Sequence, residues 1–72
     1  MYKTQDLYLA AYLKAIGKNI DSTERRGKIV YFIFKEVEDS DITDFYNNAP
    51  VGATTYKDAI NNLKTMIFHG GA

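Results

Sequence analysis

The segment Ile29–Phe34, which reads Ile-Val-Tyr-Phe-Ile-Phe, restricts the fold of this chain more than any other segment. Every residue in it is apolar or aromatic, and charged residues lie just outside both of its ends. A run of this kind, rich in β-branched and aromatic side chains, predicts a β-strand over residues 28–35. Successive side chains of a strand point to opposite faces, so both faces are apolar. We therefore expect this strand to be buried on both sides or to form part of an interface.

A second strand is predicted just before it, over residues 19–24. This segment is polar and has only one large apolar side chain, that of Ile20. Arg25, Arg26 and Gly27 connect the two segments, and glycine suits the turn of a hairpin. The pair therefore predicts an antiparallel β-hairpin whose polar strand lies at the edge, where charges limit further pairing.

A helix is predicted over residues 5–16, with Thr4 as its N-cap and Gly17 as the left-handed residue that ends it. Two neighbouring apolar stripes follow the helical spacing: Leu9, Tyr12, Leu13 and Ile16 form one, and Tyr8, Ala11 and Ala15 form the other. A helix that is apolar over so much of its circumference is usually covered on two sides. In so short a chain, the second cover is a candidate contact with another subunit.

Two more helices are predicted after the hairpin. A short one over residues 41–48 has Ser40 or Asp41 as its N-cap, and a longer one covers residues 56–69 with apolar residues on one face. Residues 70–72 are expected to form a flexible tail. The predicted fold is thus α+β, in the order helix, two-stranded antiparallel hairpin, short helix and C-terminal helix.

The chain is expected to form a single domain over residues 1–72, because a second core could not be filled at this length. A core of this size rarely gives more than about 3–5 kcal/mol of net stability without additional cross-links. Cysteine is absent and His69 is the only histidine, which excludes disulfides and argues against a structural zinc site. The missing cross-links and the surplus of apolar surface lead us to expect a homodimer.

Nine basic and nine acidic residues give a net charge of zero, which argues against a protein that coats DNA. The charges are unevenly placed, however, and predict an electrically polar molecule. Lys18, Arg25, Arg26 and Lys28 are the candidates for nucleic-acid contact, because a basic hairpin tip can follow phosphates. Ordinary solvated surface is the preferred reading, since the rest of the chain adds little positive charge.

The acidic stretch from Glu36 to Asp44 is a weak candidate for a cation site. Counted from Asp39 as a calcium-binding loop, its sixth residue is Asp44 instead of glycine and its twelfth is Pro50 instead of glutamate. These acids are better explained as charges that stabilise the start of the short helix.

No catalytic motif is found, and we expect no enzyme activity, no metal site and no cofactor. A glycine-rich phosphate loop and a metal-binding histidine pair are both missing, and the residues around His69 form no recognisable triad.

The excess of tyrosine is the most informative feature for function, because six of the ten aromatic residues are tyrosines. Tyr8, Tyr12, Tyr31, Tyr46 and Tyr56 are expected to be half-buried with their hydroxyls in water, which protein interfaces favour because tyrosine combines a large apolar ring with a polar end. Of these, Tyr8, Tyr12 and Tyr31 are the predicted interface residues. Stacking on nucleobases is the alternative, but it needs a broader sheet than two strands provide.

A membrane location is not expected, because no segment reaches the roughly 18 consecutive apolar residues of a membrane-spanning helix. The residues from Met1 to Asp6 also lack the order of a signal peptide. Together with the absence of cysteine, these features predict a cytoplasmic protein.

Several motifs together cover nearly the whole chain: Thr4-x-Asp6-Leu7-Tyr8-Leu9-Ala10-Ala11-Tyr12-Leu13 with Gly17, then Val30–Phe34, Phe45–Asn47 and Leu63–Phe68. In these motifs the chain resembles a small family of domains of unknown function from bacteria and their phages. The resemblance implies a small stand-alone protein, often encoded by phages or mobile elements, and it carries no catalytic residues.

The predicted function is that of a non-enzymatic interaction protein of phage or mobile-element type. It is expected to bind a host or phage protein, in the host cytoplasm if phage-encoded, and to form a homodimer. The alternative is a nucleic-acid-binding accessory protein that uses the basic hairpin tip. A third hypothesis is a small enzyme or ligand-binding protein whose pocket forms across a dimer interface.

Overall fold

Ile29–Phe34 is the central strand of a three-stranded antiparallel sheet in the computed structural model, which describes residues 1–69. The predicted tail, residues 70–72, and the side chain of His69 lie outside what is described. The elements follow the order β1 (Tyr2–Thr4), α1 (Leu7–Ala15), β2 (Ile20–Arg26), β3 (Ile29–Phe34), α2 (Asp39–Tyr46) and α3 (Ala53–His69). The predicted α+β class and the order helix, hairpin, helix, helix are confirmed.

The sheet has one strand more than the sequence predicts. β1 pairs with the free edge of β3, so the strand order is β1-β3-β2 and the predicted two-stranded hairpin is corrected to a three-stranded sheet. β2 lies at the other edge, as predicted. Its register against β3 shifts between Ile20 and Ser22, and it continues to Arg26, two residues beyond the predicted end.

Asp6, and not Thr4 as predicted, is the N-cap of α1. Its Oδ1 accepts hydrogen bonds from the backbone N–H of Tyr8 at 2.9 Å and of Leu9 at 3.2 Å. Thr4 belongs to β1, and its hydroxyl oxygen accepts a hydrogen bond from the N–H of Asp6 at 3.0 Å. Gly17 has the predicted left-handed conformation, with φ of 99°, and ends the helix.

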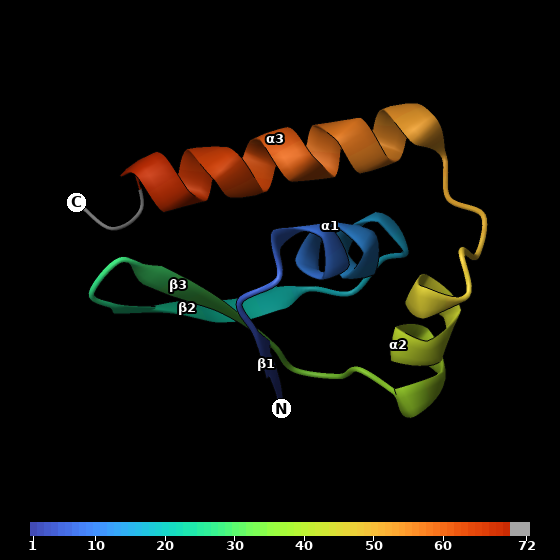
Figure 1. The fold of residues 1–72 in the computed structure, drawn as a ribbon, viewed down its shortest axis with the longest axis horizontal. Coiled ribbons are helices and arrows are strands. Elements are labelled where there is room, and N and C mark those ends of the chain that lie inside the picture. Colours follow the sequence, from blue (N-terminus) through green and yellow to red (C-terminus); the bar gives the residue numbers. More distant parts are fainter. Residues whose placement is uncertain (70–72) are drawn as a thin grey trace.

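Three layers are stacked on one another: α3, α1 and the sheet (Figure 1). Five consecutive residues of α1, from Leu9 to Leu13, are buried, because the sheet covers one side of the helix and α3 covers the other. Phe32 and Phe34 supply the sheet side of the core, and Leu63 lies on the α3 side. The prediction that this helix is covered on two sides is confirmed, and α3 of the same chain provides the second cover.

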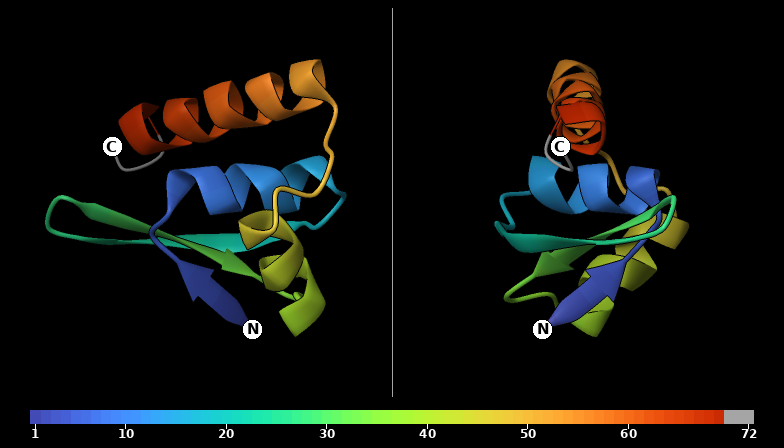
Figure 2. Two further views of the ribbon diagram at one scale, coloured as in Figure 1. Left: turned by 45° about the vertical axis from the view of Figure 1, so that its right-hand side comes forward. Right: turned by 90° about the vertical axis from the view of Figure 1, so that its left-hand side faces the viewer.

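β3 is buried on one face only. Phe32 and Phe34 are buried against α1, whereas Ile29 is 44% exposed and Tyr31 and Ile33 are half-buried on the opposite face. β1 and α2 both lie on the side of the molecule away from α3 (Figure 2). No helix among residues 1–69 has both the length and the apolar character that a membrane crossing requires.

Candidate functional site

Four tyrosines from four different elements lie near the start of α1: Tyr2, Tyr8 and Tyr56 are close to Asp6, and Tyr46 is close to Tyr2. Tyr2 comes from β1, Tyr8 from α1, Tyr46 from the end of α2 and Tyr56 from near the start of α3. We call these five residues the tyrosine surface. The two outer rings are the most accessible, since Tyr46 is 67% exposed and Tyr8 is 57% exposed.

Hydrogen bonds fix one side of this surface. The hydroxyl of Tyr56 donates to the backbone carbonyl of Tyr8 at 3.1 Å, across 48 positions of sequence. This bond ties α3 to the first turn of α1. Asp6 is held at the same place by the two backbone N–H groups that it caps.

Aromatic contacts fix the other side. The ring of Tyr46 meets the ring of Phe45 edge to face, with centroids 5.2 Å apart. Phe45 in turn contacts the buried ring of Tyr12, with centroids 5.5 Å apart. Aromatic pairs at this spacing contribute about 0.5–1.5 kcal/mol beyond their buried area. Tyr46 is thus an exposed ring held by a chain of contacts to the core.

The hydroxyls of the two less exposed tyrosines remain protonated at neutral pH. Burial, then Tyr46 and the Asp6 carboxylate, raise the pKa of Tyr2 above its ordinary value. Burial, then Asp6 and Tyr8, raise the pKa of Tyr56. The negative charge of Asp6 contributes to both shifts. The site therefore offers aromatic faces and hydroxyl groups next to a carboxylate.

The segment that contains α2 and supplies Tyr46 is rich in acidic residues. Five acidic residues and no lysine or arginine occur from residue 36 to residue 56. Lys18 pairs with Asp41, at 3.4 Å, and this is the only ion pair that the stretch makes within residues 1–69.

The structure places the three predicted interface tyrosines in three different settings. Tyr8 belongs to the tyrosine surface. Tyr12 is a core residue with 5% of its surface exposed, so it offers a partner almost no area. Tyr31 lies on the outer face of the sheet, where the ammonium group of Lys3 sits 4.6 Å from its ring centroid. Tyr46 and Tyr56 were expected from the sequence only to be half-buried, and Tyr2 was not selected.

The basic residues of the hairpin tip do not form one patch. Arg25 points to the helical side, where its Nη2 donates to the carbonyl of Ile67 at 2.7 Å, near the end of α3. Arg26 points to the outer face, where its Nε lies 2.7 Å from a carboxylate oxygen of Glu24. Hydrogen bonds from Lys3 and then Arg26 lower the pKa of Glu24. Lys28 alone of the tip residues lies in the turn itself.

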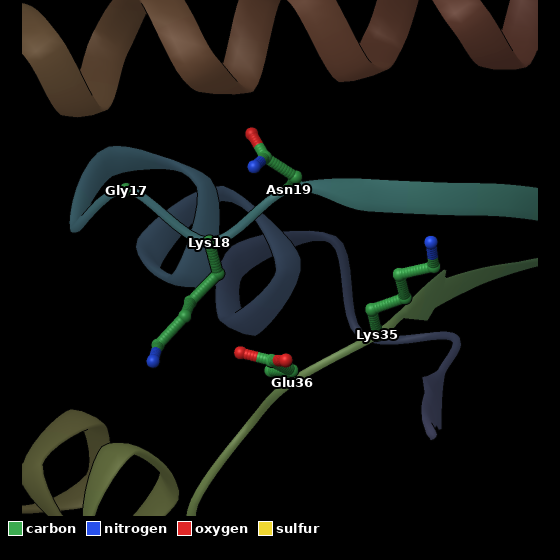
Figure 3. A pocket seen from close by; sticks show the side chains of 5 residues that line it. All are labelled: Gly17, Lys18, Asn19, Lys35 and Glu36. Atoms are coloured by element: carbon green, nitrogen blue, oxygen red, sulfur yellow. The ribbon is translucent and has the colours of Figure 1, made fainter.

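Lys18, the fourth predicted nucleic-acid contact, lies away from the tip, where it lines a surface hollow of about 320 Å³ (Figure 3). The side chain extends toward α2, where its ammonium group forms an ion pair with Asp41. Lys35, on the other side of the hollow, has an Asp21 oxygen at 4.0 Å. Both ammonium groups already have acidic neighbours, so the hollow is a poor anion site.

The remaining polar groups of interest are the possible metal ligands of the described residues and the lining of the hollow. Residues 1–69 contain no group of three or more histidine, cysteine or acidic side chains placed to hold a metal ion. The described lining of the hollow consists of glycine, lysine, asparagine and glutamate.

The sequence model of a protein family described as "Domain of unknown function (DUF5659)" matches residues 1–69. No curated protein and no solved structure matches the chain.

Proposed function

This chain belongs to the DUF5659 family of domains of unknown function, and from this premise we propose that it is a non-enzymatic protein-binding domain that uses the tyrosine surface. The wider setting predicted from the sequence, a phage or mobile-element protein that acts on a host or phage protein in the host cytoplasm, is kept as part of the proposal.

The observation that carries the proposal is the exposure of two aromatic rings, those of Tyr8 and Tyr46, which lie outside the apolar core cluster. Tyr8 and Tyr46 are both more than half exposed, although large rings lose favourable burial in that position. Tyrosine is enriched at protein interfaces because its rigid ring gives a large contact area at low entropic cost. Tyr46 is restrained further by Phe45, so little ordering is left for binding.

A comparative pull-down tests this proposal. The wild-type protein and the double variant Tyr8→Ala/Tyr46→Ala are used as baits in host lysate treated with nuclease. Phe68→Ala is the matched control, because Phe68 is 78% exposed but belongs to α3 near the other end of the chain. A partner retained by the wild type and the control but lost by the double variant is the expected result. Equal retention by all three baits would contradict the proposal.

The homodimer stays a prediction, and the structure leaves it with less support. α3 occupies the side of α1 that was expected to meet a second subunit. The outer face of β3 is still uncovered by the described elements, but Ile29 is its only exposed large apolar residue. Stable interfaces bury about 800 Å² per partner and have an apolar centre, and one exposed isoleucine supplies little of that. Sedimentation equilibrium at micromolar concentration measures the oligomeric state directly.

The nucleic-acid alternative also stays a prediction. It requires the four basic side chains to contact the phosphates of one nucleic-acid backbone. They lie on different sides of the fold: Lys18, Arg25, Arg26 and Lys28. A mobility-shift assay at low salt tests it, since phosphate binding weakens steeply as salt is added.

A further inference from the structure

We propose that the tyrosine surface binds a basic segment of its partner, one that presents arginine or lysine side chains to the exposed rings. This inference rests on the proposed protein-binding function and specifies the chemistry of the partner.

The first argument is charge complementarity. Asp6 lies among the rings and makes none of the four ion pairs found within residues 1–69. The segment from residue 36 to residue 58, which supplies Tyr46 and Tyr56, carries six acidic residues and one basic residue, Lys57. A partner with positive charge is attracted to such a surface, while an acidic partner is repelled.

The second argument is that the chain already binds one of its own cations in this way. On the outer face of the sheet, the ammonium group of Lys3 lies 4.6 Å from the ring centroid of Tyr31. A carboxylate oxygen of Glu24 holds the same ammonium group at 2.9 Å. A tyrosine ring beside a carboxylate is thus a cation site in this fold. The tyrosine surface has the same combination, in Asp6 and its neighbouring rings, but no lysine or arginine of this chain is paired with Asp6 among the described residues.

The third argument is the state of the hydroxyl groups. Both hydroxyls are neutral at pH 7, as is usual for tyrosine, and burial raises the pKa of each further, so a cation meets the face of a neutral ring. Arginine fits such a surface especially well, because its planar guanidinium stacks on a ring while its N–H groups reach a carboxylate.

The test is an NMR titration of the ¹⁵N-labelled protein with a short arginine–glycine peptide. A peptide of equal length with glutamine in place of arginine is the control. The arginine peptide is expected to shift the backbone signals of Tyr2, Tyr8, Tyr46 and Tyr56, and the glutamine peptide is not. The interaction is expected to weaken as salt is added.

Variants separate ring contacts from general attraction to an acidic surface. Tyr46→Ala is expected to lower the affinity for the arginine peptide about three- to tenfold, whereas Tyr46→Phe keeps the ring and most of the affinity. Phe68→Ala should bind as the wild type does. Equal binding of the two peptides, unchanged affinity in Tyr46→Ala, or shifts confined to the outer face of the sheet would each overturn the inference.

Two further outcomes are distinguishable. If the peptide fails to bind while the pull-down still depends on Tyr8 and Tyr46, the basic partner is refuted and the protein-binding function stands. If the protein instead associates with itself through its own basic hairpin tip, the signals of Arg25 and Lys28 shift with protein concentration alone, and that result refutes a separate basic partner.

Discussion

Replacing Leu63 tests the central packing claim, that α3 of the same chain covers the second side of α1. Leu63 is fully buried, with no exposed surface, and belongs to the same apolar cluster as Leu9 and Leu13 of α1. Truncating a buried leucine to alanine costs about 2–5 kcal/mol, because the lost transfer energy is joined by the energy of the cavity. A core of this size supplies only about 3–5 kcal/mol in total. Leu63→Ala is therefore expected to lose most of its free energy of unfolding, so that a sizeable fraction of the protein is unfolded even without denaturant.

A milder variant gives a measurable shift. Leu63→Val removes one methylene group and is expected to cost about 1 kcal/mol. With a denaturant slope near 1 kcal/mol per molar urea, as in small domains, the unfolding midpoint should fall by about 1 M. The neighbouring Lys64→Ala is the matched control, because Lys64 is exposed on the same helix and should change the free energy of unfolding by at most about 0.5 kcal/mol.

The assay is urea unfolding followed by far-ultraviolet circular dichroism. A Leu63→Val midpoint equal to that of the wild type and of Lys64→Ala would refute a dry, well-packed contact between α1 and α3. Repeating the wild-type measurement at protein concentrations that differ about tenfold also tests the predicted homodimer, because subunit association would raise the midpoint with concentration.

Three further predictions concern the caps and the tyrosines. Asp6→Ala should lower the free energy of unfolding by about 1 kcal/mol in urea melts, and Asp6→Asn, which keeps the capping oxygen, should lower it less. Arg25→Ala should cost about 0.5–1 kcal/mol in the same assay, because Arg25 donates to a carbonyl at the end of α3, and Arg26→Ala should cost less. Because burial raises the pKa of Tyr2 and Tyr56, their stabilising neutral forms persist below about pH 10 and are lost as the pH rises through the folded values. Tyr2→Phe and Tyr56→Phe should therefore each flatten the alkaline fall in melting temperature; an unchanged pH profile would contradict these assignments.

The hairpin and the central strand were predictable because their pattern is local and strong. β1 was not, since it has only three residues and one apolar ring, which is too short for any periodicity. Missing β1 also misplaced the cap of α1. Thr4 and Asp6 are both good N-cap residues, and only the pairing of Thr4 with Phe32 in the sheet decides between them.

Arg25 and Arg26 lie on opposite faces of the sheet because β2 ends two residues later than predicted. β2 was predicted to end at residue 24, which left Arg25 and Arg26 together in a turn. The strand runs through both residues, and the period of two sends consecutive side chains to opposite faces. Two residues of extra strand length therefore divide the predicted patch.

The tyrosine surface could not be read from the sequence, because its members come from four elements and have no common spacing. The excess of tyrosine correctly indicated that some tyrosine rings lie outside the core. Composition alone does not show which of these rings are neighbours in the fold. Tyr12 shows the difficulty: it lies one helical turn from Tyr8 on the same helix, yet it is buried and Tyr8 is exposed. The position of α2, which places Phe45 against Tyr12, separates the two.

The absence of cysteine and of a zinc-binding set of residues no longer argues for a second subunit once the three layers are known. From the sequence, together with the surplus of apolar surface, it led to the expectation of a homodimer. In the structure, α3 buries α1 from the side opposite the sheet, and the cluster from Leu9 to Leu63 closes within one chain. The exposed rings of Tyr8 and Tyr46 therefore cannot be explained as half of an unfinished core. Both rings lie outside the apolar cluster, Tyr46 is held by Phe45, and the segment that supplies Tyr46 is acidic. This combination is expected of a surface that recognises another molecule.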